Sequence, residues 1–392
     1  MDSTTLPSLV VILFVAAAAP ILSDLLRRRI LVPSVVLEIA GGILVGPILD
    51  IASEDDIIAF LAAFGLTTLM FLAGLEIDMP RIRGGPLQRA VVGWGFSLAL
   101  GAAFGLALTP VDGSRSGLIV GLAVTTTALS TLLPILRDSG ELQNDFGTEV
   151  LAGAAVGELG PLIAISVLLS TDRPARTVLV LAAFIVIVLV AATVAMHPRS
   201  ERLARILDQT LTTSGQLAVR LVMLFTGVMV WIATELGLDV LLGAFAAGMV
   251  FRLFSAGDNE REAALVDAKL QGLGFGFFVP VFFVVTGMRF DLDAIRDRPA
   301  LLIGVPAFLL VFLVVRGAPA YLMHRDRTIT DRLALVCYLA TELPLVVVIT
   351  DIGVRTGRLR SSTAAALVAA AMISVLTFPL VAARLRGRVT ES

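Results

Sequence analysis

Apolar runs of bilayer length recur along the whole chain, and they constrain its fold more than any other feature of the sequence. A transmembrane helix needs about 20 mostly apolar residues in succession, whereas a membrane β-barrel would show alternating apolar residues. Composition agrees with helices, because 57% of the 392 residues are hydrophobic and 16% are charged. A soluble domain carries about 25% charged residues. We therefore predict an all-α, multi-pass membrane protein.

The apolar runs predict thirteen transmembrane spans. Their approximate bounds are Leu6–Ser23, Leu31–Leu49, Ile57–Ile77, Leu87–Leu108, Ser116–Leu136, Phe146–Leu169, Thr177–Met196, Gln216–Thr234, Asp239–Leu253, Leu270–Gly287, Ala300–Met323, Arg332–Thr350 and Ser361–Ala383. No basic segment precedes the first run, so we interpret it as a span rather than a signal peptide. The polar segment Ser255–Asp267 is predicted to be a short amphipathic helix or a linker. Because the chain ends soon after the last span, we expect no regulatory nucleotide-binding domain.

The basic residues are distributed unevenly between the loops on the two sides of the predicted membrane. With an external N-terminus, roughly two thirds of the 30 Lys and Arg residues fall in one set of loops, and positive charge favours the cytoplasmic side. This bias predicts an external N-terminus and a cytoplasmic C-terminus in a bacterial cytoplasmic membrane. The net charge of −2 gives no indication of a nucleic-acid partner, and no zinc-protease, nucleophile-elbow or phosphate-loop motif predicts an enzyme.

Two similar segments indicate an internal repeat of opposite orientation. The segment FLAGLEIDMPRI (Phe71–Ile82) aligns with VVTGMRFDLDAI (Val284–Ile295), so that Asp78 matches Asp291. The segments lie an odd number of predicted spans apart, which places Asp78 on the cytoplasmic side and Asp291 outside. Inverted repeats of this kind are typical of secondary transporters. Chance similarity between two helix ends is the alternative interpretation.

A second match predicts two helices that are broken at the same depth. Val120–Leu136 aligns with Val336–Ile352, and both segments carry polar residues at their centres. In the first, Thr125–Thr127 lowers helix propensity and offers hydroxyls that compete for backbone groups. In the second, Glu342 precedes Pro344, which removes a backbone donor and disfavours helix just before it. Broken helices commonly build the ion site of transporters near the midplane.

Glu158 is the candidate residue for proton and cation binding. It lies near the middle of the apolar run Thr148–Ile165, and an ionisable residue at that depth indicates a functional site. Burial favours its protonated form, whereas the ionised form offers hard oxygen ligands to a small cation. A proton and a cation would therefore compete for one carboxylate. The alternative is a structural carboxyl group that only holds helices together.

Other charged residues extend this candidate site. Arg316 is the only basic residue well inside a predicted span, since the others lie in loops or within five residues of a span end, and a buried arginine must be paired. Its candidate partners are Glu158 and Glu342, either as a pair that a cation displaces or as a static salt bridge. Glu149 is expected near the cytoplasmic mouth, where it would attract cations. The sequence has two histidines, His197 and His324, both at predicted helix ends.

The chain resembles the monovalent cation:proton antiporter family of the Kef and NapA type. The matching stretches are PSVVLEIAGGILVGP, FLAGLEID, TTTALSTLLPILRDSGELQNDFG, AGAAVGELG and PVFFVVTGMRFDL. The resemblance implies thirteen helices with inverted repeats and two broken, crossing helices. It also implies a core transport part (residues 87–169 and 300–383) that moves against a dimerisation part (residues 6–77 and 216–287), with residues 177–196 as the linker helix. A homodimer in the lipid bilayer that transports Na⁺ or K⁺ and H⁺ without a cofactor is the further implication.

The chain departs from the family pattern at the predicted site. Electrogenic members carry two adjacent aspartates where this chain has Gly157 and Glu158, and a lysine where the nearest match is Arg316. One titratable carboxylate and an arginine that keeps its proton predict one proton per cation, hence electroneutral exchange. The predicted exchange residues are Glu158 and Arg316, and the predicted cation ligands are Glu158, Thr125, Thr126, Thr127 and Glu342. The alternatives are a potassium efflux channel, an organic-anion symporter and a non-transporting membrane sensor.

Overall fold

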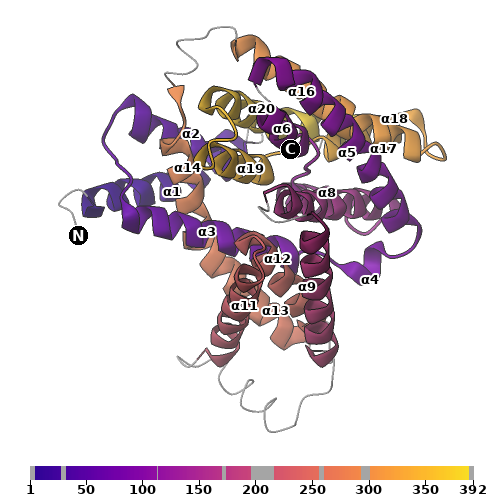
Figure 1. The fold of residues 1–392 in the computed structure, drawn as a ribbon, viewed down its shortest axis with the longest axis horizontal. Helices are drawn as coiled ribbons and strands as arrows, with labels where there is room; N and C mark the ends of the chain where they lie inside the picture. The colour runs from indigo at the N-terminus through magenta and orange to yellow at the C-terminus, as the bar shows by residue number, and fades with distance from the viewer. Residues whose placement is uncertain are drawn as a thin grey trace. The chain divides into compact units, whose positions relative to one another are not determined.

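The computed structural model describes residues 5–27, 32–112, 114–169, 174–195, 216–255, 260–292 and 301–387 (Figure 1). Within these ranges the chain forms helices and connecting turns but no strand. Nine helical segments among them are long and apolar enough to cross a membrane, and three shorter apolar helices accompany them. The predicted all-α, multi-pass fold is confirmed, whereas the count of thirteen spans stays a prediction.

The helices belong to two compact units, and the first unit consists of Glu54–Asp78 and Ser166–Val285, with Thr5 at the N-terminal end. Its helices are α3 (Asp56–Leu75), α9 (Pro174–Ala195), α11 (Leu217–Glu235), α12 (Val240–Ser255), α13 (Glu260–Leu273), a π-helical turn (Gly274–Phe278) and most of α14 (Val279–Met288). Helix α12 packs against α3, α9 and α11, and Figure 1 shows α9, α11 and α13 close to α12. Asp78, beyond the end of α3, pairs with Arg252 of α12 at 3.6 Å.

The segment that precedes the tenth predicted span differs from expectation. Residues from Glu260 onward form α13, and this helix continues through the π-helical turn into α14 without a break. The residues Glu260–Leu273 are mostly strong helix formers, including Glu, Ala, Leu and Lys, so the helix extends well into the polar part of the sequence. The helix alternative is therefore confirmed for the described part of this segment, although the helix is longer than predicted and is continuous with the next span.

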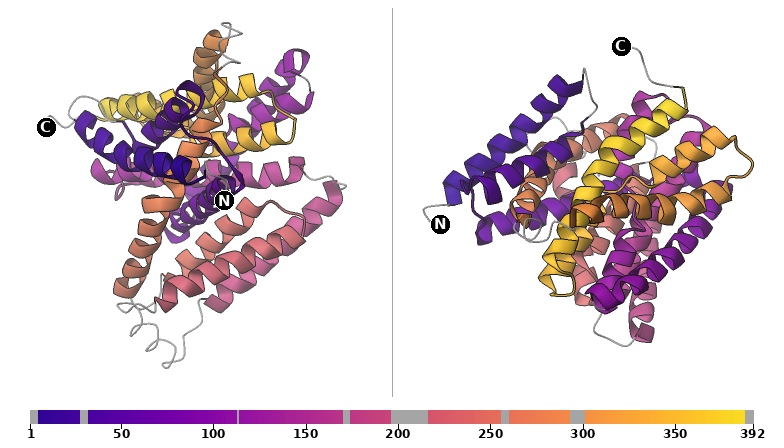
Figure 2. Two further views of the ribbon diagram at one scale, coloured as in Figure 1. Left: turned by 90° about the vertical axis from the view of Figure 1, so that its left-hand side faces the viewer. Right: turned by 90° about the horizontal axis from the view of Figure 1, so that it is seen from above.

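The second unit consists of Leu6–Ser53, Met79–Ile165 and Thr286–Ser392 and contains the broken helices. Its helices are α1 (Thr5–Arg27), α2 (Ser34–Ile43) with a π-helical turn (Leu44–Ile48), α4 (Met79–Ile82), α5 (Gly85–Asp112), α6 (Ser114–Ala123), α7 (Leu129–Asp138), α8 (Asp145–Leu169), α16 (Leu301–Phe312) with a π-helical turn (Leu313–Gly317), α17 (Ala318–Met323), α18 (Ile329–Leu339), α19 (Pro344–Arg355) and α20 (Ser361–Leu385). The long helix α20 packs against α16, α18 and α19, and Figure 2 shows it in yellow beside them.

Two helices are broken where the sequence predicts it. Helix α6 ends at Ala123 and α7 begins at Leu129, so the three threonines lie in the unwound segment between them. Helix α18 ends at Leu339 and α19 begins at Pro344, which occupies a first-turn position that needs no backbone N–H. The prediction of two helices broken at matching positions is therefore confirmed.

The two broken helices repeat the same backbone hydrogen bonds. Before the breaks, the amide of Thr125 donates to the carbonyl of Leu122, as Thr341 does to Tyr338. At the other ends, α7 and α19 both close with a glycine of positive φ, Gly140 (68°) and Gly357 (63°). The next two amides in each case donate to one carbonyl, Leu136 or Gly353, as in a glycine-terminated helix cap. This correspondence supports the internal repeat.

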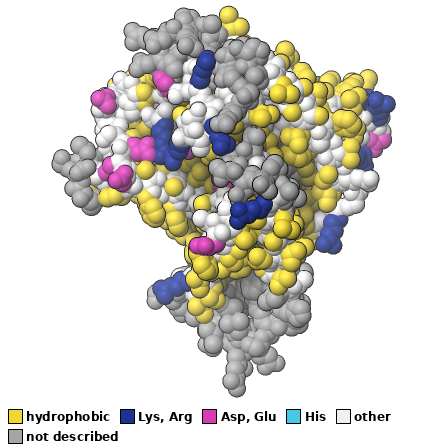
Figure 3. Space-filling model, viewed as in Figure 1, with side chains coloured by type: hydrophobic (Ala, Val, Ile, Leu, Met, Phe, Trp, Pro, Cys, Tyr) yellow, Lys and Arg dark blue, Asp and Glu magenta, His cyan; other side chains and the backbone are white. Residues whose placement is uncertain are grey.

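The described surface is apolar over wide areas, as a bilayer requires. In the face shown in Figure 3, hydrophobic side chains cover much of the described surface, and charged side chains are few. Phe14, Leu179 and Ile303 are among the large hydrophobic side chains that are more than two thirds exposed (72%, 70% and 73%). Such exposure would favour aggregation in water, whereas hydrocarbon solvates it. The predicted division into transport, linker and dimerisation parts stays a proposal.

Candidate functional site

The two breaks lie against each other in the second unit. The amide of Ala128 donates to the carbonyl of Thr341 at 2.9 Å, so the unwound backbones are hydrogen-bonded directly. The hydroxyl of Thr126 lies 3.3 Å from Oε2 of Glu342. These are the two positions that the repeat alignment pairs, and the structure brings them together. The crossing therefore concentrates hydroxyl, carbonyl and carboxylate oxygens at one buried place.

Glu342 is completely buried at this crossing, with 0% of its surface exposed. Its main chain is fixed by Ser374 of α20, whose Oγ accepts from the Glu342 amide at 3.0 Å and donates to the Glu342 carbonyl at 2.9 Å. Among the described residues, Oε1 of Glu342 has no hydrogen-bond partner. A buried carboxylate oxygen without a donor is costly, so this atom is suited to accept a cation or a proton.

Arg316 lies in the π-helical turn between α16 and α17 and is 3% exposed. Its Nε donates to the hydroxyl of Thr127 at 2.9 Å. Its Nη1 lies 3.4 Å from the hydroxyl of Ser97 in α5, and its Nη2 donates to the carbonyl of Gly153 in α8 at 3.0 Å. The hydrogen bonds of the guanidinium thus reach two hydroxyls and a carbonyl. Its exchange of partners with Glu158 stays a prediction.

Glu158 is buried in α8, with 1% of its surface exposed, and follows a glycine that contacts the first break. The amide of Thr127 donates to the carbonyl of Gly157 at 3.2 Å. A Cβ atom at Gly157 would lie 2.5 Å from Nη2 of Arg316 and 2.8 Å from Oγ1 of Thr127. The position where electrogenic members carry a second acid is therefore occupied by the side chains of Arg316 and Thr127. Only glycine fits there without displacing one of them.

Thr125 and Trp94 form a further contact between the first break and the helices around it. The indole Nε1 of Trp94, in α5, donates to the carbonyl of Thr125 at 3.2 Å. The ring of Trp94 also packs against Gly160 of α8, where a Cβ atom would lie 2.5 Å from the ring. The carbonyl of Thr125 is thus already hydrogen-bonded, whereas Thr126 and Thr127 face Glu342 and Arg316. All three threonines, which were predicted as cation ligands, are buried, but each contacts a different side chain.

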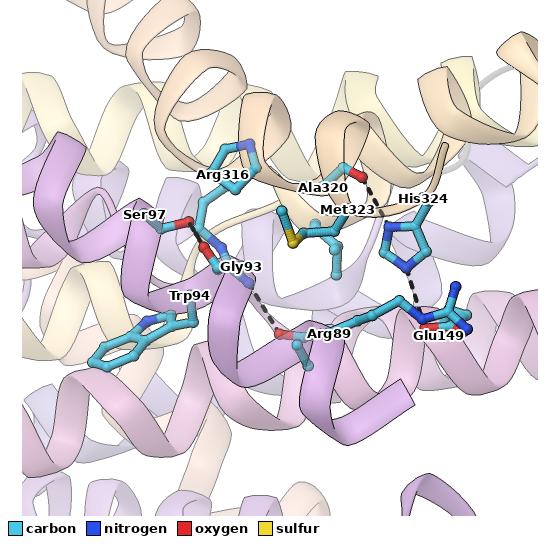
Figure 4. Close-up of a pocket in the computed structure, with 13 residues that line it drawn as sticks. Arg89, Gly93, Trp94, Ser97, Glu149, Arg316, Ala320, Met323 and His324 are labelled. Carbon is cyan, nitrogen blue, oxygen red and sulfur yellow. Dashed lines mark hydrogen bonds and ion pairs between the residues drawn. The ribbon is translucent and has the colours of Figure 1, made fainter. Parts of the chain in front are cut away.

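A pocket extends from Arg316 to a second group of charged residues (Figure 4). Its lining includes Ser97, Trp94 and Arg316 near one end and Arg89, Glu149 and His324 near the other. Oε2 of Glu149 lies 3.1 Å from Nε2 of His324, and Oε1 lies 3.2 Å from Nη2 of Arg89. Glu149 is 4% exposed and is held by both partners, so its surroundings differ from those of an open cation attractor.

Several residues of this site were not predicted from the sequence. Ser97, Trp94, Ser374 and the pairing of His324 with Glu149 depend on contacts between helices far apart in the chain. One signal was available for Trp94, because an indole N–H inside an apolar helix needs an acceptor. Similarly, a buried serine such as Ser374 needs a hydrogen-bond partner, but the sequence does not say which one.

The comparison with known families decides the identity of the fold. The family described as sodium/hydrogen exchanger, transmembrane, matches residues 10–383. The chain belongs to this family. Among its relatives, the putative Na⁺/H⁺ antiporter YjbQ of Bacillus subtilis is 27% identical over 403 residues, which cover 97% of this chain and 63% of YjbQ. The Na⁺/H⁺-K⁺ antiporter GerN of Bacillus cereus is 27% identical over 281 residues, which cover 68% of this chain and 67% of GerN.

A solved structure has a similar fold. The sodium proton antiporter MjNhaP1 from Methanocaldococcus jannaschii, solved at pH 8, superimposes with a TM-score of 0.70. The alignment covers 96% of this chain and 95% of MjNhaP1, at 13% sequence identity. At that identity the match concerns the fold alone. The chain spans less than two thirds of the length of YjbQ.

Proposed function

We propose that this chain is a secondary antiporter that exchanges a monovalent cation, Na⁺ or K⁺, for protons across a bacterial cytoplasmic membrane. The observation that carries the proposal is the buried crossing, where Oε1 of Glu342 has no hydrogen-bond partner among the described residues and Glu158 lies on the adjoining helix. Buried acidic and hydroxyl oxygens are suited to small hard cations rather than to an organic anion. Relatives named as Na⁺/H⁺ antiporters support the same activity.

In the proposed exchange, the proton and the cation compete for Glu158. When Glu158 is ionised, its carboxylate, Glu342 and the hydroxyls of Thr125–Thr127 supply oxygen ligands to the cation. When Glu158 is protonated, the site releases the cation. Arg316 connects the first break to α8 through its hydrogen bonds to Thr127 and Gly153. Its positive charge offsets one buried negative charge. No covalent step and no cofactor is required.

The count of ionisable groups favours electroneutral exchange. An arginine keeps its proton in proteins, so the positive charge of Arg316 stays constant during exchange. Glu158 is then the one group that loses a proton when a cation binds. Because Gly157 cannot carry a second acid, the exchange of one proton for one cation follows.

The remaining expectations concern the whole protein. We propose an external N-terminus and a cytoplasmic C-terminus, because the positive loops lie on the side of the C-terminus. We also propose a homodimer in which the transport part moves against the dimerisation part, as the family resemblance implies. The resulting change of access would expose Glu158 to one side of the membrane at a time.

The proposed activity is tested by exchange in proteoliposomes. Purified protein is reconstituted with an internal pH indicator, an outward proton gradient is imposed, and Na⁺, Li⁺ or K⁺ is added outside. The wild type should move protons on addition of at least one cation, and Glu158→Gln should lower the rate at least 100-fold. Glu235→Gln is the control, because Glu235 lies in the other unit and is exposed at the end of α11. Full activity of Glu158→Gln would refute the role of Glu158.

Electroneutrality is tested in the same vesicles. Valinomycin with K⁺ on both sides clamps the membrane voltage, and Na⁺-dependent proton flux is measured at several voltages. The proposal predicts equal rates at all voltages. A rate that rises several-fold with voltage would show net charge movement and would contradict a one-for-one exchange.

A further inference from the structure

Glu149 and His324 form a buried pair that the proposed cation exchange does not use. The pair lines the pocket at the end away from Ser97 and Arg316 (Figure 4). Each residue is 4% exposed, and the two belong to helices α8 and α17 or its end, 175 positions apart in the chain. Two titratable groups buried together need a consistent set of hydrogens, and the contacts determine that set.

The contacts of the imidazole require one more proton than a neutral histidine and an ionised glutamate hold. Nδ1 of His324 lies 2.8 Å from the carbonyl oxygen of Ala320, which can only accept, so Nδ1 carries a hydrogen. Nε2 lies 3.1 Å from Oε2 of Glu149. Without a hydrogen, both of these atoms would present lone pairs to each other. A hydrogen bond at this distance therefore needs a second proton, shared by His324 and Glu149.

The direct contact of Arg89 with Glu149 favours an ionised carboxylate, and so leaves the shared proton on the imidazole. From α5, Arg89 reaches Oε1 of Glu149 at 3.2 Å and thereby stabilises its ionised form. Arg89 also reaches Asp326 at 3.1 Å, in the turn after α17, where Arg325 and Arg327 flank Asp326 in the chain. From α4, Arg81 lies 3.5 Å from the hydroxyl of Thr148, the residue before Glu149. The other charged group in the pocket lining is Arg316.

The pair and Arg316 join the same two helical segments at two levels. On α8, Glu149, Gly153 and Gly157 follow one another at intervals of one turn, and so lie on one face. Arg316 donates to the carbonyl of Gly153. His324, eight residues after Arg316 in the chain, contacts Glu149. Both levels line the pocket. We therefore expect a change of the contact between Glu149 and His324 to shift α8 beside Arg316.

We propose that Glu149 and His324 constitute a second proton-binding site, separate from Glu158. When a proton is bound, this pair closes the end of the pocket that lies away from Ser97 and Arg316. Loss of this proton places two acceptors opposite each other at hydrogen-bond distance, which separates α8 from α17 and opens the pocket toward Arg316. The ligand of this site is the proton alone. The proposal concerns the pair itself and does not depend on cation exchange at Glu158.

Imidazole nitrogen NMR tests the protonation directly. The chain has two histidines, so ¹⁵N-histidine-labelled protein gives one set of signals from His324 after subtraction of the spectrum of His324→Gln. At mildly acidic pH both nitrogens of His324 should carry hydrogens. As the pH is raised, the Nε2 hydrogen should be lost while the Nδ1 hydrogen remains. A neutral His324 with an unprotonated Nε2 throughout the pH range in which the protein stays folded would overturn the proposal.

Two further arms distinguish this proposal from the proposed exchange. Glu149→Gln should abolish the acid-form signal, because an amide donates to Nε2 and no extra proton is needed, and an unchanged signal would contradict the pairing. Glu158→Gln should leave the titration of His324 intact even though exchange is lost. Opening of the pocket is followed by the fluorescence of Trp94 in a Trp231→Phe background, since the chain has two tryptophans. A pH-dependent change should appear there and vanish in His324→Gln, and its persistence in that variant would refute the opening.

Discussion

At the scale of single residues, the site is organised by what stands beside Glu158. Gly157 leaves room for the guanidinium of Arg316 and the hydroxyl of Thr127, both within 3 Å of where a Cβ atom would lie. The guanidinium of Arg316 donates one hydrogen bond each to Thr127, Ser97 and Gly153, and these three bonds hold it in position. The space that a second acid at position 157 would need is therefore filled by the side chains of Arg316 and Thr127.

Substitution of Gly157 should disturb this arrangement. In Gly157→Ala the added methyl group displaces Nη2 of Arg316 from Gly153, so we expect about a tenfold loss of exchange rate, equivalent to ~1.4 kcal/mol. Gly95→Ala is the matched control, because no atom lies within 4 Å of a Cβ atom at Gly95. The exchange rates of Gly157→Ala and Gly95→Ala are measured in proteoliposomes and compared with that of the wild type. Equal rates in the two variants would show that the position of Arg316 is irrelevant.

Thr127 offers a second test of the same contacts. Its hydroxyl accepts from Nε of Arg316 at 2.9 Å and lies 2.6 Å from the carbonyl of Leu339. Thr127→Val keeps the shape but leaves a buried guanidinium donor unpaired, which costs about 1–3 kcal/mol of unfolding free energy. Thr127→Ser keeps the hydroxyl and should retain most of the stability and exchange. Thermal unfolding in detergent measures the difference, and a Val variant as stable as the Ser variant would contradict the assignment.

At the scale of elements, the site depends on two interrupted helices whose unwound residues are hydrogen-bonded by side chains of neighbouring helices. Ser374 of α20 takes both backbone groups of Glu342, and Trp94 of α5 takes the carbonyl of Thr125. Backbone groups freed from a helix inside a membrane must be satisfied by neighbouring side chains. The intact helices α5 and α20 therefore supply the hydrogen bonds that the broken helices lack.

Ser374 should consequently matter more than a neighbouring hydroxyl on the same helix. Ser374→Ala leaves the amide and the carbonyl of Glu342 without this partner, so we expect a loss of about 1–3 kcal/mol and a raised apparent KM for the cation. Thr377→Ala is the control, because its exposed hydroxyl bonds only to Ile373 of its own helix. Stability and cation dependence are measured for both. If the two variants behave alike, Ser374 does not hold the break.

The elements of the site were predictable to the extent that local sequence decides them. Three consecutive threonines and Pro344 weaken a helix wherever they occur, so both breaks were predicted correctly. The charged segment from Glu260 is helical, as one of the two predicted alternatives had it, and its strong helix propensity extends α13 into the next span. The contacts of Arg316 and the pairing of Glu149 with His324 depend on packing between distant helices. The sequence predicts that these polar residues need hydrogen-bond partners when buried, but it does not predict which residues those partners are.

At the scale of the whole molecule, the repeat predicts opposite orientations for its two halves. In the predicted repeat Asp78 and Asp291 take equivalent positions, and the loop charges predict a cytoplasmic Asp78 and an external Asp291. The matching helix ends at Gly140 and Gly357 agree with such a repeat. A transporter built from two inverted halves can face either side of the membrane by similar movements.

Cysteine labelling tests these orientations. The single cysteine, Cys337, is buried, and Cys337→Ala provides a background free of thiols. In intact cells, a membrane-impermeant maleimide should label Asp291→Cys but label Asp78→Cys only after the membrane is permeabilised. Loss of the Asp78 pair with Arg252 is tolerable, because partly exposed ion pairs contribute about 0–1 kcal/mol. The reverse labelling pattern would invert the proposed topology.

Competition between a proton and a cation for Glu158 is measured most directly as proton release from the purified protein. Na⁺, Li⁺ or K⁺ is added to the protein in weakly buffered detergent solution, and a pH indicator reports the protons released. The wild type should release close to one proton per chain on saturation with the transported cation, and Glu158→Gln should release none. Release from Glu158→Gln equal to that of the wild type, or saturable cation binding by the wild type without release, would contradict the competition.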